Sequence, residues 1–230
     1  RMIGKMSQKE YWNSRSQNWH DHDEPLVPGQ PELEFQEQLL VPGGSTLVLG
    51  VTPQLCELAF TISKSVTSVD FAIDLIEALG IDGVEYVCQD WIEFLRNKER
   101  DGGYDNILTD GGLLALSFPE AWNQMSTLIY DNLRPGGIFC ARIYLSTENP
   151  PKKRYDNPSL ERFVSSIGDI DENWMVHPLH PAYANYDIQY TFPPKDVVMR
   201  VFSHFILEDE FVPSYEEGDR FVTFAFRRPR

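Results

Sequence analysis

The sequence has few cysteines, no long apolar run and a shortage of positive charge. Its three cysteines are an odd number without metal-site spacing, namely Cys56, Cys88 and Cys140. Each lies in an apolar stretch, where a free thiol acts as a small hydrophobe, so a reduced, cytoplasmic protein is expected. No apolar run reaches the roughly 18–20 residues that span a bilayer, and residues 1–5 lack the apolar core of a secretion signal. We therefore expect no membrane partner.

The charge balance disfavours nucleic acid as a partner. There are 20 Lys and Arg against 35 Asp and Glu, a formal net charge of −15. Affinity for a phosphate backbone comes mainly from basic side chains, and the basic clusters at 152–154 and 227–230 are short enough to be a solvated loop and tail. In residues 20–24 histidine alternates with acids, which is typical of a solvated turn, so no metal site is expected.

The order of periodic segments predicts an α/β protein with a doubly wound, mostly parallel seven-stranded sheet and helices on both faces. Residues 46–50 form a short apolar run, as a strand buried on both faces requires, and Leu55, Leu58, Ala59 and Ile62 then recur at helical spacing. The alternation continues to residue 145, and the five strands expected up to there cover residues 46–50, 65–70, 84–88, 104–110 and 138–145. Right-handed crossovers place the helices on both faces. Residues 206–215 and 220–227 are expected to add a C-terminal antiparallel hairpin.

Residues that follow the strands carry the information on function, because ligands of open parallel sheets bind beyond the carboxyl ends of the strands. Gly50 ends the first strand, and Asp70 follows the second, 20 residues later. At that offset an acid can accept both hydroxyls of a ribose. Asp90 with Trp91, and Asp110 with Gly111, follow the third and fourth strands. Singly these residues also fit helix N-caps, core packing and turns.

Together with the Pro-Gly-Gly turn at 135–137, this order resembles the class I S-adenosylmethionine-dependent methyltransferases, over residues 44–145. The resemblance implies S-adenosylmethionine as methyl donor. It places Gly50 near the methionine part, Asp70 on the ribose, Asp90 and Trp91 at the adenine, and Asp110 facing the donor amino group. The cofactor-binding residues that it implies are Tyr11, Trp12, Arg15, Gly50, Val51, Thr52, Asp70, Phe71, Asp90, Trp91, Asp110 and Gly111.

The first turn departs from that family at three positions. Val48 stands where an acid is usual, and Thr52 and Gln54 stand where glycines are usual. Glycines allow positive φ and close contact, so a wider or differently shaped turn is expected here. The absence of a Gly-x-Gly-x-x-Gly and of a P-loop lysine disfavours a dinucleotide dehydrogenase and nucleotide hydrolysis.

The chain is expected to form a single domain of four parts: an N-terminal helical cap (1–42), the cofactor-binding core (43–145), an insertion over the acceptor site (146–194), and a final helix with the hairpin (195–230). The cap contains helices expected at 9–20 and 31–40, the first of which would close over the cofactor. The aromatic insertion suggests a small organic acceptor, and its candidate catalytic residues are His177, His180 and Tyr183. A packed aromatic lid with satisfied histidines is the alternative.

The function expected is methyl transfer to a small-molecule acceptor, by a monomer or homodimer. Two alternatives stay open. One is a noncatalytic protein of the same fold that binds S-adenosylmethionine or acts as a scaffold, which the altered first turn suggests. The other is a protein methyltransferase.

Overall fold

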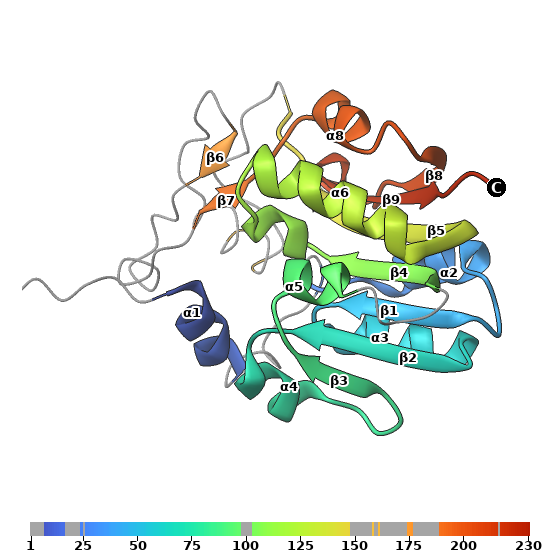
Figure 1. The fold of residues 1–230 in the computed structure, drawn as a ribbon. Coiled ribbons are helices and arrows are strands. Elements are labelled where there is room, and N and C mark those ends of the chain that lie inside the picture. The colour runs from blue at the N-terminus through green and yellow to red at the C-terminus, as the bar shows by residue number, and fades with distance from the viewer. Residues whose placement is uncertain are drawn as a thin grey trace, which may run out of the picture.

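Strands and helices alternate along most of the chain (Figure 1). A computed structural model describes residues 7–16, 24, 26–97, 103–147, 158, 161, 174–176, 189–215 and 217–230. The strands are β1 (Ser45–Leu49), β2 (Ser65–Asp70), β3 (Glu85–Cys88), β4 (Tyr104–Asp110), β5 (Leu133–Tyr144), β6 (Met175–Val176), β7 (Tyr190–Thr191), β8 (Ile206–Phe211) and β9 (Phe221–Arg227). The α-helices are α1 (Gln8–Arg15), α2 (Gln30–Leu39), α3 (Pro53–Ile62), α4 (Ile73–Leu79), α5 (Trp91–Arg96), α6 (Glu120–Asn132) and α8 (Lys195–Val201), and the 3-10 turns are η2 (Gly112–Ala115) and η4 (Gly218–Arg220).

Seven strands form one sheet in the order β3-β2-β1-β4-β5-β9-β8. Strands β1 to β5 pair in parallel with one another, whereas β9 is antiparallel to both β5 and β8. The strand order reverses between β1 and β4, which is where a ligand site is expected in such a sheet. This topology confirms the predicted fold, including the antiparallel C-terminal pair.

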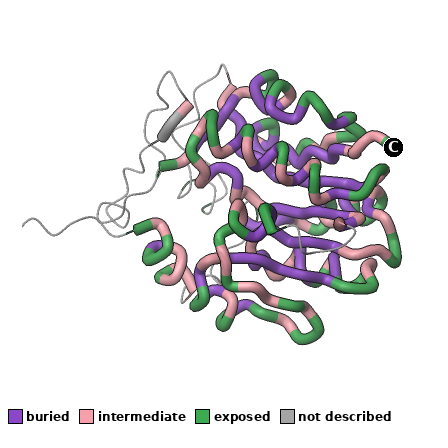
Figure 2. Tube along the Cα trace, in the orientation of Figure 1, coloured by how far each residue is buried: buried purple, intermediate pink, exposed green. Residues whose placement is uncertain are grey.

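The sheet is buried on both faces because alternate side chains of each central strand enter different cores. Leu47, Ile107 and Phe139 pack with α5, α6 and α8, while Val48 and Leu108 pack with α2 and α3. Figure 2 shows the central strands as buried over most of their length. Burial on both faces explains the continuous apolar runs in the sequence. No helix in the described ranges is long and apolar enough to cross a membrane.

The fifth strand differs from the prediction, because it begins at Leu133 instead of residue 138. The Pro-Gly-Gly segment at 135–137 is therefore part of β5 and not a turn before it. Gly136 has φ +83° and its amide donates to the carbonyl of Arg228, while Gly137 accepts from the Arg228 amide. The C-terminal tail thus pairs with the segment that local composition marks as a turn.

Three helices end earlier in the described residues than the sequence predicts. Helix α1 is predicted over 9–20 and ends at Arg15, α5 is predicted over 90–100 and ends at Arg96, and α8 is predicted over 195–205 and ends at Val201. The helix ends were predicted from side-chain periodicity, which continues past the last hydrogen-bonded turn. The sequence also predicts a helix that Asn157 caps, and this segment lies outside the described residues except at Pro158 and Glu161. The histidines of residues 20–24 lie outside them too.

The cysteines do not share one environment. Cys56 and Cys140 are buried, and burial raises the pKa of the Cys56 thiol to about 11. Cys88 is exposed, although its apolar surroundings in the sequence predict a small buried hydrophobe. It ends β3, which is the edge strand of the sheet and has little buried surface. An edge position is not visible in local composition.

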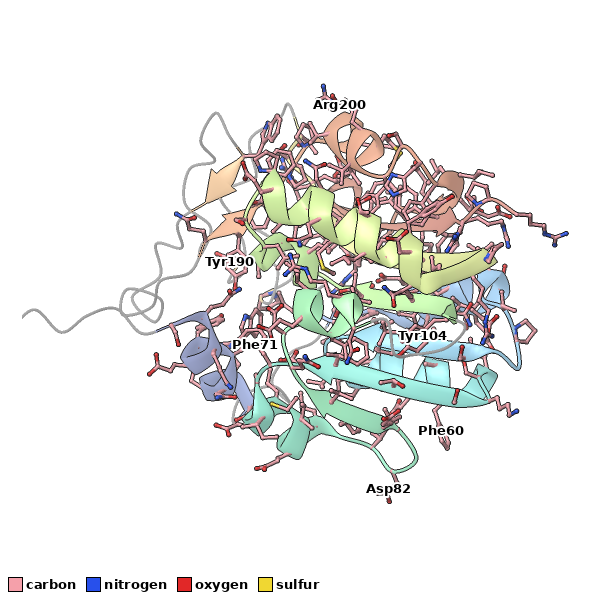
Figure 3. The ribbon with its side chains drawn as sticks, in the orientation of Figure 1. Phe60, Phe71, Asp82, Tyr104, Tyr190 and Arg200 are labelled. Atoms are coloured by element: carbon pink, nitrogen blue, oxygen red, sulfur yellow. The ribbon has the colours of Figure 1, made fainter. Side chains whose placement is uncertain are left out.

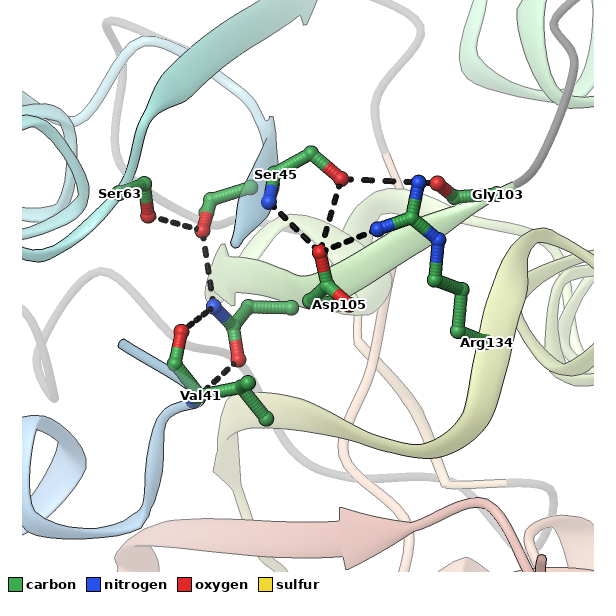
Figure 4. A network of polar contacts seen from close by, with 8 residues as sticks. Val41, Ser45, Ser63, Gly103, Asp105 and Arg134 are labelled. Carbon is green, nitrogen blue, oxygen red and sulfur yellow. Dashed lines mark hydrogen bonds and ion pairs between the residues drawn. The ribbon is translucent and has the colours of Figure 1, made fainter. Parts of the chain in front are cut away.

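Side chains of β4 form hydrogen bonds and an ion pair at the amino ends of the strands (Figure 4). Asp105 accepts hydrogen bonds from the Ser45 amide at 2.7 Å and from Arg134 at 2.6 Å. Asn106 bonds both backbone groups of Val41, at 2.8 and 3.0 Å. These contacts hold the entry to β1 against β4 and, through Arg134, the start of β5.

The basic C-terminus is structural. Arg228 donates to the carbonyls of Tyr130 and Leu133 near the end of α6, and its guanidinium lies 4.5 Å from the Tyr130 ring centroid. Arg227 pairs with Glu208 of β8 at 2.8 Å. Cations at a helix C-terminus satisfy its last carbonyls, so these arginines do not form a free basic patch.

Candidate functional site

A cavity of about 220 Å³ lies at the carboxyl ends of β1, β2 and β4, where the strand order reverses. It is lined by Gln8, Trp12, Leu49, Gly50, Val51, Thr52, Asp70, Phe71, Leu75, Asp90, Trp91, Ile92, Asp110, Gly112, Ala115 and Leu116. Nine of the twelve residues predicted to bind a cofactor are in this lining. Tyr11, Arg15 and Gly111 are the three that do not line it.

Asp70 ends β2 and is 8% exposed. Its carboxylate accepts the Ala72 amide at 2.8 Å and is not the N-cap of α4, which is Ala72 itself. Burial raises the pKa of Asp70 to about 6, against the opposing effect of the Ala72 and Phe71 amides. A carboxylate has about four acceptor sites, so one that accepts backbone amides can also accept hydrogen bonds from a ligand.

Asp90 is the N-cap of α5. A helix N-cap is the alternative to a ligand contact in the interpretation of the sequence. Its Oδ1 accepts the amides of Ile92 and Glu93 at 2.9 and 3.2 Å. It nevertheless lines the cavity, and its Oδ2 has no hydrogen bond among the described residues. The cap and a ligand contact are therefore compatible.

The turn after β1 is held open by Gly50, which has φ +108°. The Ser68 hydroxyl donates to the Gly50 carbonyl at 2.7 Å, which ties this turn to β2. Thr52 is the N-cap of α3 but makes no side-chain capping bond, because its hydroxyl points to Asp110 at 3.4 Å. The residue that replaces a family glycine thus contacts the acid of a neighbouring strand.

Asp110 belongs to a buried ion-pair network that the sequence prediction missed. Arg142 of β5 donates from Nε to Asp110 at 2.6 Å and lies 3.8 Å from Glu32 of α2, which also accepts from Thr223. Burial opposes the charge of Arg142, but the two carboxylates outweigh it and raise its pKa. Burial raises the pKa of Glu32 despite Arg142. The one signal in the sequence is an arginine inside an otherwise apolar strand.

Helix α1 packs beside α4 (Figure 1) and contributes Gln8 and Trp12 to the cavity lining. Gln8 donates to the carbonyl of Ala115 in η2 at 3.1 Å, and Asn13 accepts the Asp74 amide on α4 at 3.2 Å. Trp12 packs against the cluster of Val51 and α4. The helix therefore bridges the two sides of the cavity, whereas Tyr11 is buried beside Trp12 and contributes packing.

The predicted catalytic residues His177, His180 and Tyr183 lie outside the described residues. Of the insertion, the structure describes mainly the short strands β6 and β7 and the residues that follow β7. Strand β7 contacts η2, and the Thr191 hydroxyl donates to the carbonyl of Leu116, which lines the cavity, at 3.4 Å. Figure 3 shows Phe71 and Tyr190 at the same end of the molecule, near α1.

The lining carries negative charge alone. It includes Asp70, Asp90 and Asp110 and no Lys, Arg or His side chain among the described residues. The rest is mostly apolar, as in small-molecule sites. In the described part of the chain no group of three or more His, Cys, Asp or Glu side chains is placed to hold a metal ion. The cavity suits a ligand with a positive charge and an apolar body.

Neither a family model nor a curated protein matches the sequence. Solved structures match its fold at high probability. The 1,6-didemethyltoxoflavin-N1-methyltransferase of Burkholderia thailandensis, with bound 1,6-didemethyltoxoflavin and S-adenosylhomocysteine, is 18% identical with a TM-score of 0.63, over 96% of this chain and 87% of that one. An S-adenosylmethionine-dependent methyltransferase of Methanosarcina mazei is 14% identical with a TM-score of 0.62, over 89% and 99%.

A protein of Rhodobacter sphaeroides assigned by name to the zinc-dependent alcohol dehydrogenases is 20% identical with a TM-score of 0.69, over 96% and 98% of the two chains. At these identities the matches show the fold. That fold, with its strand order and antiparallel β9, is the one of the class I S-adenosylmethionine-dependent methyltransferases.

Proposed function

We propose that the chain is an S-adenosylmethionine-dependent methyltransferase that acts on a small-molecule acceptor. The observation that carries this proposal is the convergence of Asp70, Asp90 and Asp110, from the ends of β2, β3 and β4, on one cavity that no Lys, Arg or His of the described residues lines. The donor is a cation with hydrogen-bond donors on its ribose, adenine and amino groups, so carboxylates complement it at each of these points.

The lining offers a partner for each part of the donor. Asp70 would accept the ribose hydroxyls, and the unused oxygen of Asp90 would accept the adenine amino group. Gly50 leaves room for the donor to approach the backbone after β1. A Cβ atom added at Gly50 would contact Trp91, at 3.8 Å, and, apart from its chain neighbours, no other described residue within 4 Å. Asp110 would face the donor's amino group with Oδ2, the oxygen near Thr52, because Arg142 donates to its Oδ1.

When bound, the donor supplies a methyl group on a positively charged sulfur, which leaves as a neutral thioether once the acceptor takes the methyl. The chain's part is alignment and exclusion of water, and alignment alone can supply about 7–11 kcal/mol of a barrier. Helix α1, which Gln8 ties to η2, contributes Gln8 and Trp12 to the cavity lining. His177, His180 and Tyr183 are proposed to line the acceptor side and to take the acceptor's proton.

Two further observations support a small acceptor. The insertion ends at β7, which lies next to the cavity-lining turn η2, and Ser146 at its start donates to the carbonyl of Pro193 near its end. The structural matches include enzymes whose names give small substrates, such as the 1,6-didemethyltoxoflavin-N1-methyltransferase. A shared fold does not transfer a substrate, so this support is by analogy.

Calorimetry with S-adenosylmethionine, followed by turnover, tests the proposal. We expect saturable binding, and products 14 mass units heavier after incubation with a metabolite extract and labelled donor. Label in the macromolecular fraction would instead identify a protein methyltransferase. Absence of binding at millimolar donor would overturn the proposal.

A noncatalytic protein that binds the donor is the second candidate. It is favoured by Thr52 at a glycine position of the family and by the engagement of Asp110 with Arg142. Both features engage Asp110 within the chain, and Asp110 is the acid proposed to face the donor's amino group. This candidate predicts donor binding without any labelled product, so the turnover step separates the two.

A further inference from the structure

The indole of Trp91 is directed away from the end of its own strand. Its backbone begins α5 after β3, but its Nε1 donates to the carbonyl of Val69 in β2 at 2.7 Å. Its six-membered ring lies against the Cα of Gly112 in η2, where an added Cβ would overlap the ring. The same ring would lie 3.8 Å from a Cβ atom added at Gly50, at the end of β1. The ring therefore lies between the ends of β1 and β4.

This position can be related to the donor by the order of the strands. The ends follow one another as β3, β2, β1 and β4, and the donor follows as adenine, ribose, sulfur and amino-acid tail. If Asp70 at the end of β2 holds the ribose, the adenine extends toward β3 and Asp90. The sulfur would then lie near the ends of β1 and β4, where the Trp91 ring lies beside Gly50 and Gly112.

We propose that the Trp91 ring faces the sulfonium of the donor and makes the site select S-adenosylmethionine over the neutral product S-adenosylhomocysteine. This inference rests on the proposed function, and it differs from the sequence expectation of a ring beside the purine. A cation near the face of a tryptophan is attracted by the ring's quadrupole, and tryptophan is the best of the aromatic side chains for this contact. Trp91 is partly buried and lines the cavity, so the contact would be largely desolvated.

The carboxylates add a smaller preference in the same direction. Asp110 is neutralised by Arg142 at 2.6 Å, and Asp90 is solvent-exposed. Among the described residues, Asp70 is the one of these three carboxylates that is both buried and without a cation in contact, and it would lie at the ribose. The Trp91 ring, between the ends of β1 and β4, is thus the lining group proposed to distinguish a sulfonium from a thioether.

The ratio of two dissociation constants tests the inference. Calorimetry measures S-adenosylmethionine and S-adenosylhomocysteine on the wild-type chain and on Trp91→Leu. We expect a wild-type preference for S-adenosylmethionine that falls by about 2- to 30-fold in Trp91→Leu. A loss of packing alone would weaken both ligands by the same factor. An unchanged ratio, or no wild-type preference, would overturn the inference, whereas failure of both ligands to bind the wild type would overturn the proposed function.

Two variants separate the aromatic face from the rest of the side chain. Trp91→Phe removes the hydrogen bond to Val69 but keeps an aromatic ring, so most of the preference should remain; a loss as large as in Trp91→Leu would contradict the inference. Trp12→Leu is the matched control, because Trp12 also lines the cavity but packs with Val51 and α4. It should weaken both ligands equally, and a changed ratio there would assign the preference to Trp12. Circular dichroism checks that each variant is folded.

Discussion

Asp105 and Asp70 are partly or wholly buried acids at opposite ends of the sheet, and their surroundings differ. At the amino end, burial would raise the pKa of Asp105, but the Ser45 amide and Arg134 outweigh it and lower the pKa. At the carboxyl end, burial raises the pKa of Asp70 to about 6, and no cation offsets it. A satisfied acid contributes to stability, whereas an acid buried without a cation indicates a site for a ligand.

Asp110 lies between these two cases. It shares the carboxyl end with Asp70, but like Asp105 it has an arginine partner, and the side chains of Asp110 and Arg142 are only 4% and 7% exposed. Its position is therefore that of a site residue, while its charge is already compensated. The difference between the three acids can be tested by removing one partner at a time.

The largest effect is expected from Arg142→Met, which leaves Asp110 and Glu32 buried without their cation. Breaking a buried pair from one side costs about 3–5 kcal/mol, because the remaining charge is uncompensated. Chemical denaturation should show a loss of this size in the free energy of unfolding. Arg134→Met is the matched control: Arg134 is 44% exposed, so its loss should cost about 1 kcal/mol or less. Equal losses in the two variants would remove the distinction between the ends.

The next effect concerns ligand binding. Asp70→Ala removes charge-assisted hydrogen bonds to the ribose worth about 1.5–3 kcal/mol, so S-adenosylmethionine should bind roughly 10- to 150-fold more weakly. Because burial raises the pKa of Asp70, its ionised form disfavours folding near pH 7, so the variant should be at least as stable as the wild type in the absence of ligand. Calorimetry gives the first value and a melting curve the second. Unchanged affinity would refute the role of Asp70.

Asp105→Ala should show the opposite result. It removes the bonds that Asp105 accepts from Ser45 and Arg134 and that join β1, β4 and β5. Since Arg134 is largely solvated, we expect a loss of about 1–2 kcal/mol in the free energy of unfolding and no change in donor affinity. Weaker binding at unchanged stability would show that the two ends are not independent.

Much of this contrast could be predicted from the sequence, because residues that follow parallel strands must meet at one edge of the sheet. The positions of Gly50, Asp70 and Asp110 at the cavity needed only the strand assignments. The Arg142 pairing could not be predicted in this way, since it depends on the register of β4 with β5, where Asp110 faces Arg142.

Side-chain direction and long-range pairing account for the other differences. The spacing places Trp91 after β3 but does not fix where its ring points, and contact with Gly112 requires the fold of η2. Likewise, Gly136 is typical of a turn in the local sequence, and its place in β5 depends on pairing with the distant Arg228. The exposure of Cys88 follows from the edge position of β3, which depends on the strand order.

The smallest effect is the pH dependence of the two acids, and its sign differs between them. Asp105 has a lowered pKa in the folded state, so its stabilising effect is present above about pH 4 and is lost as pH falls through the folded pKa. Asp70 has a raised pKa, so the folded state binds more protons between about pH 4 and pH 6, and its contribution to stability falls as pH rises through that range.

Donor binding should follow the ionised form of Asp70, since only the carboxylate accepts both ribose hydroxyls. With a pKa of about 6, roughly a tenth of the side chain is ionised at pH 5, so affinity should drop about tenfold from pH 7 to pH 5. Asp70→Asn should bind more weakly at pH 7 and lose this dependence, whereas Asp105→Asn should retain it. A wild-type affinity that is constant over this range would mean that the Asp70 carboxylate does not hold the ligand.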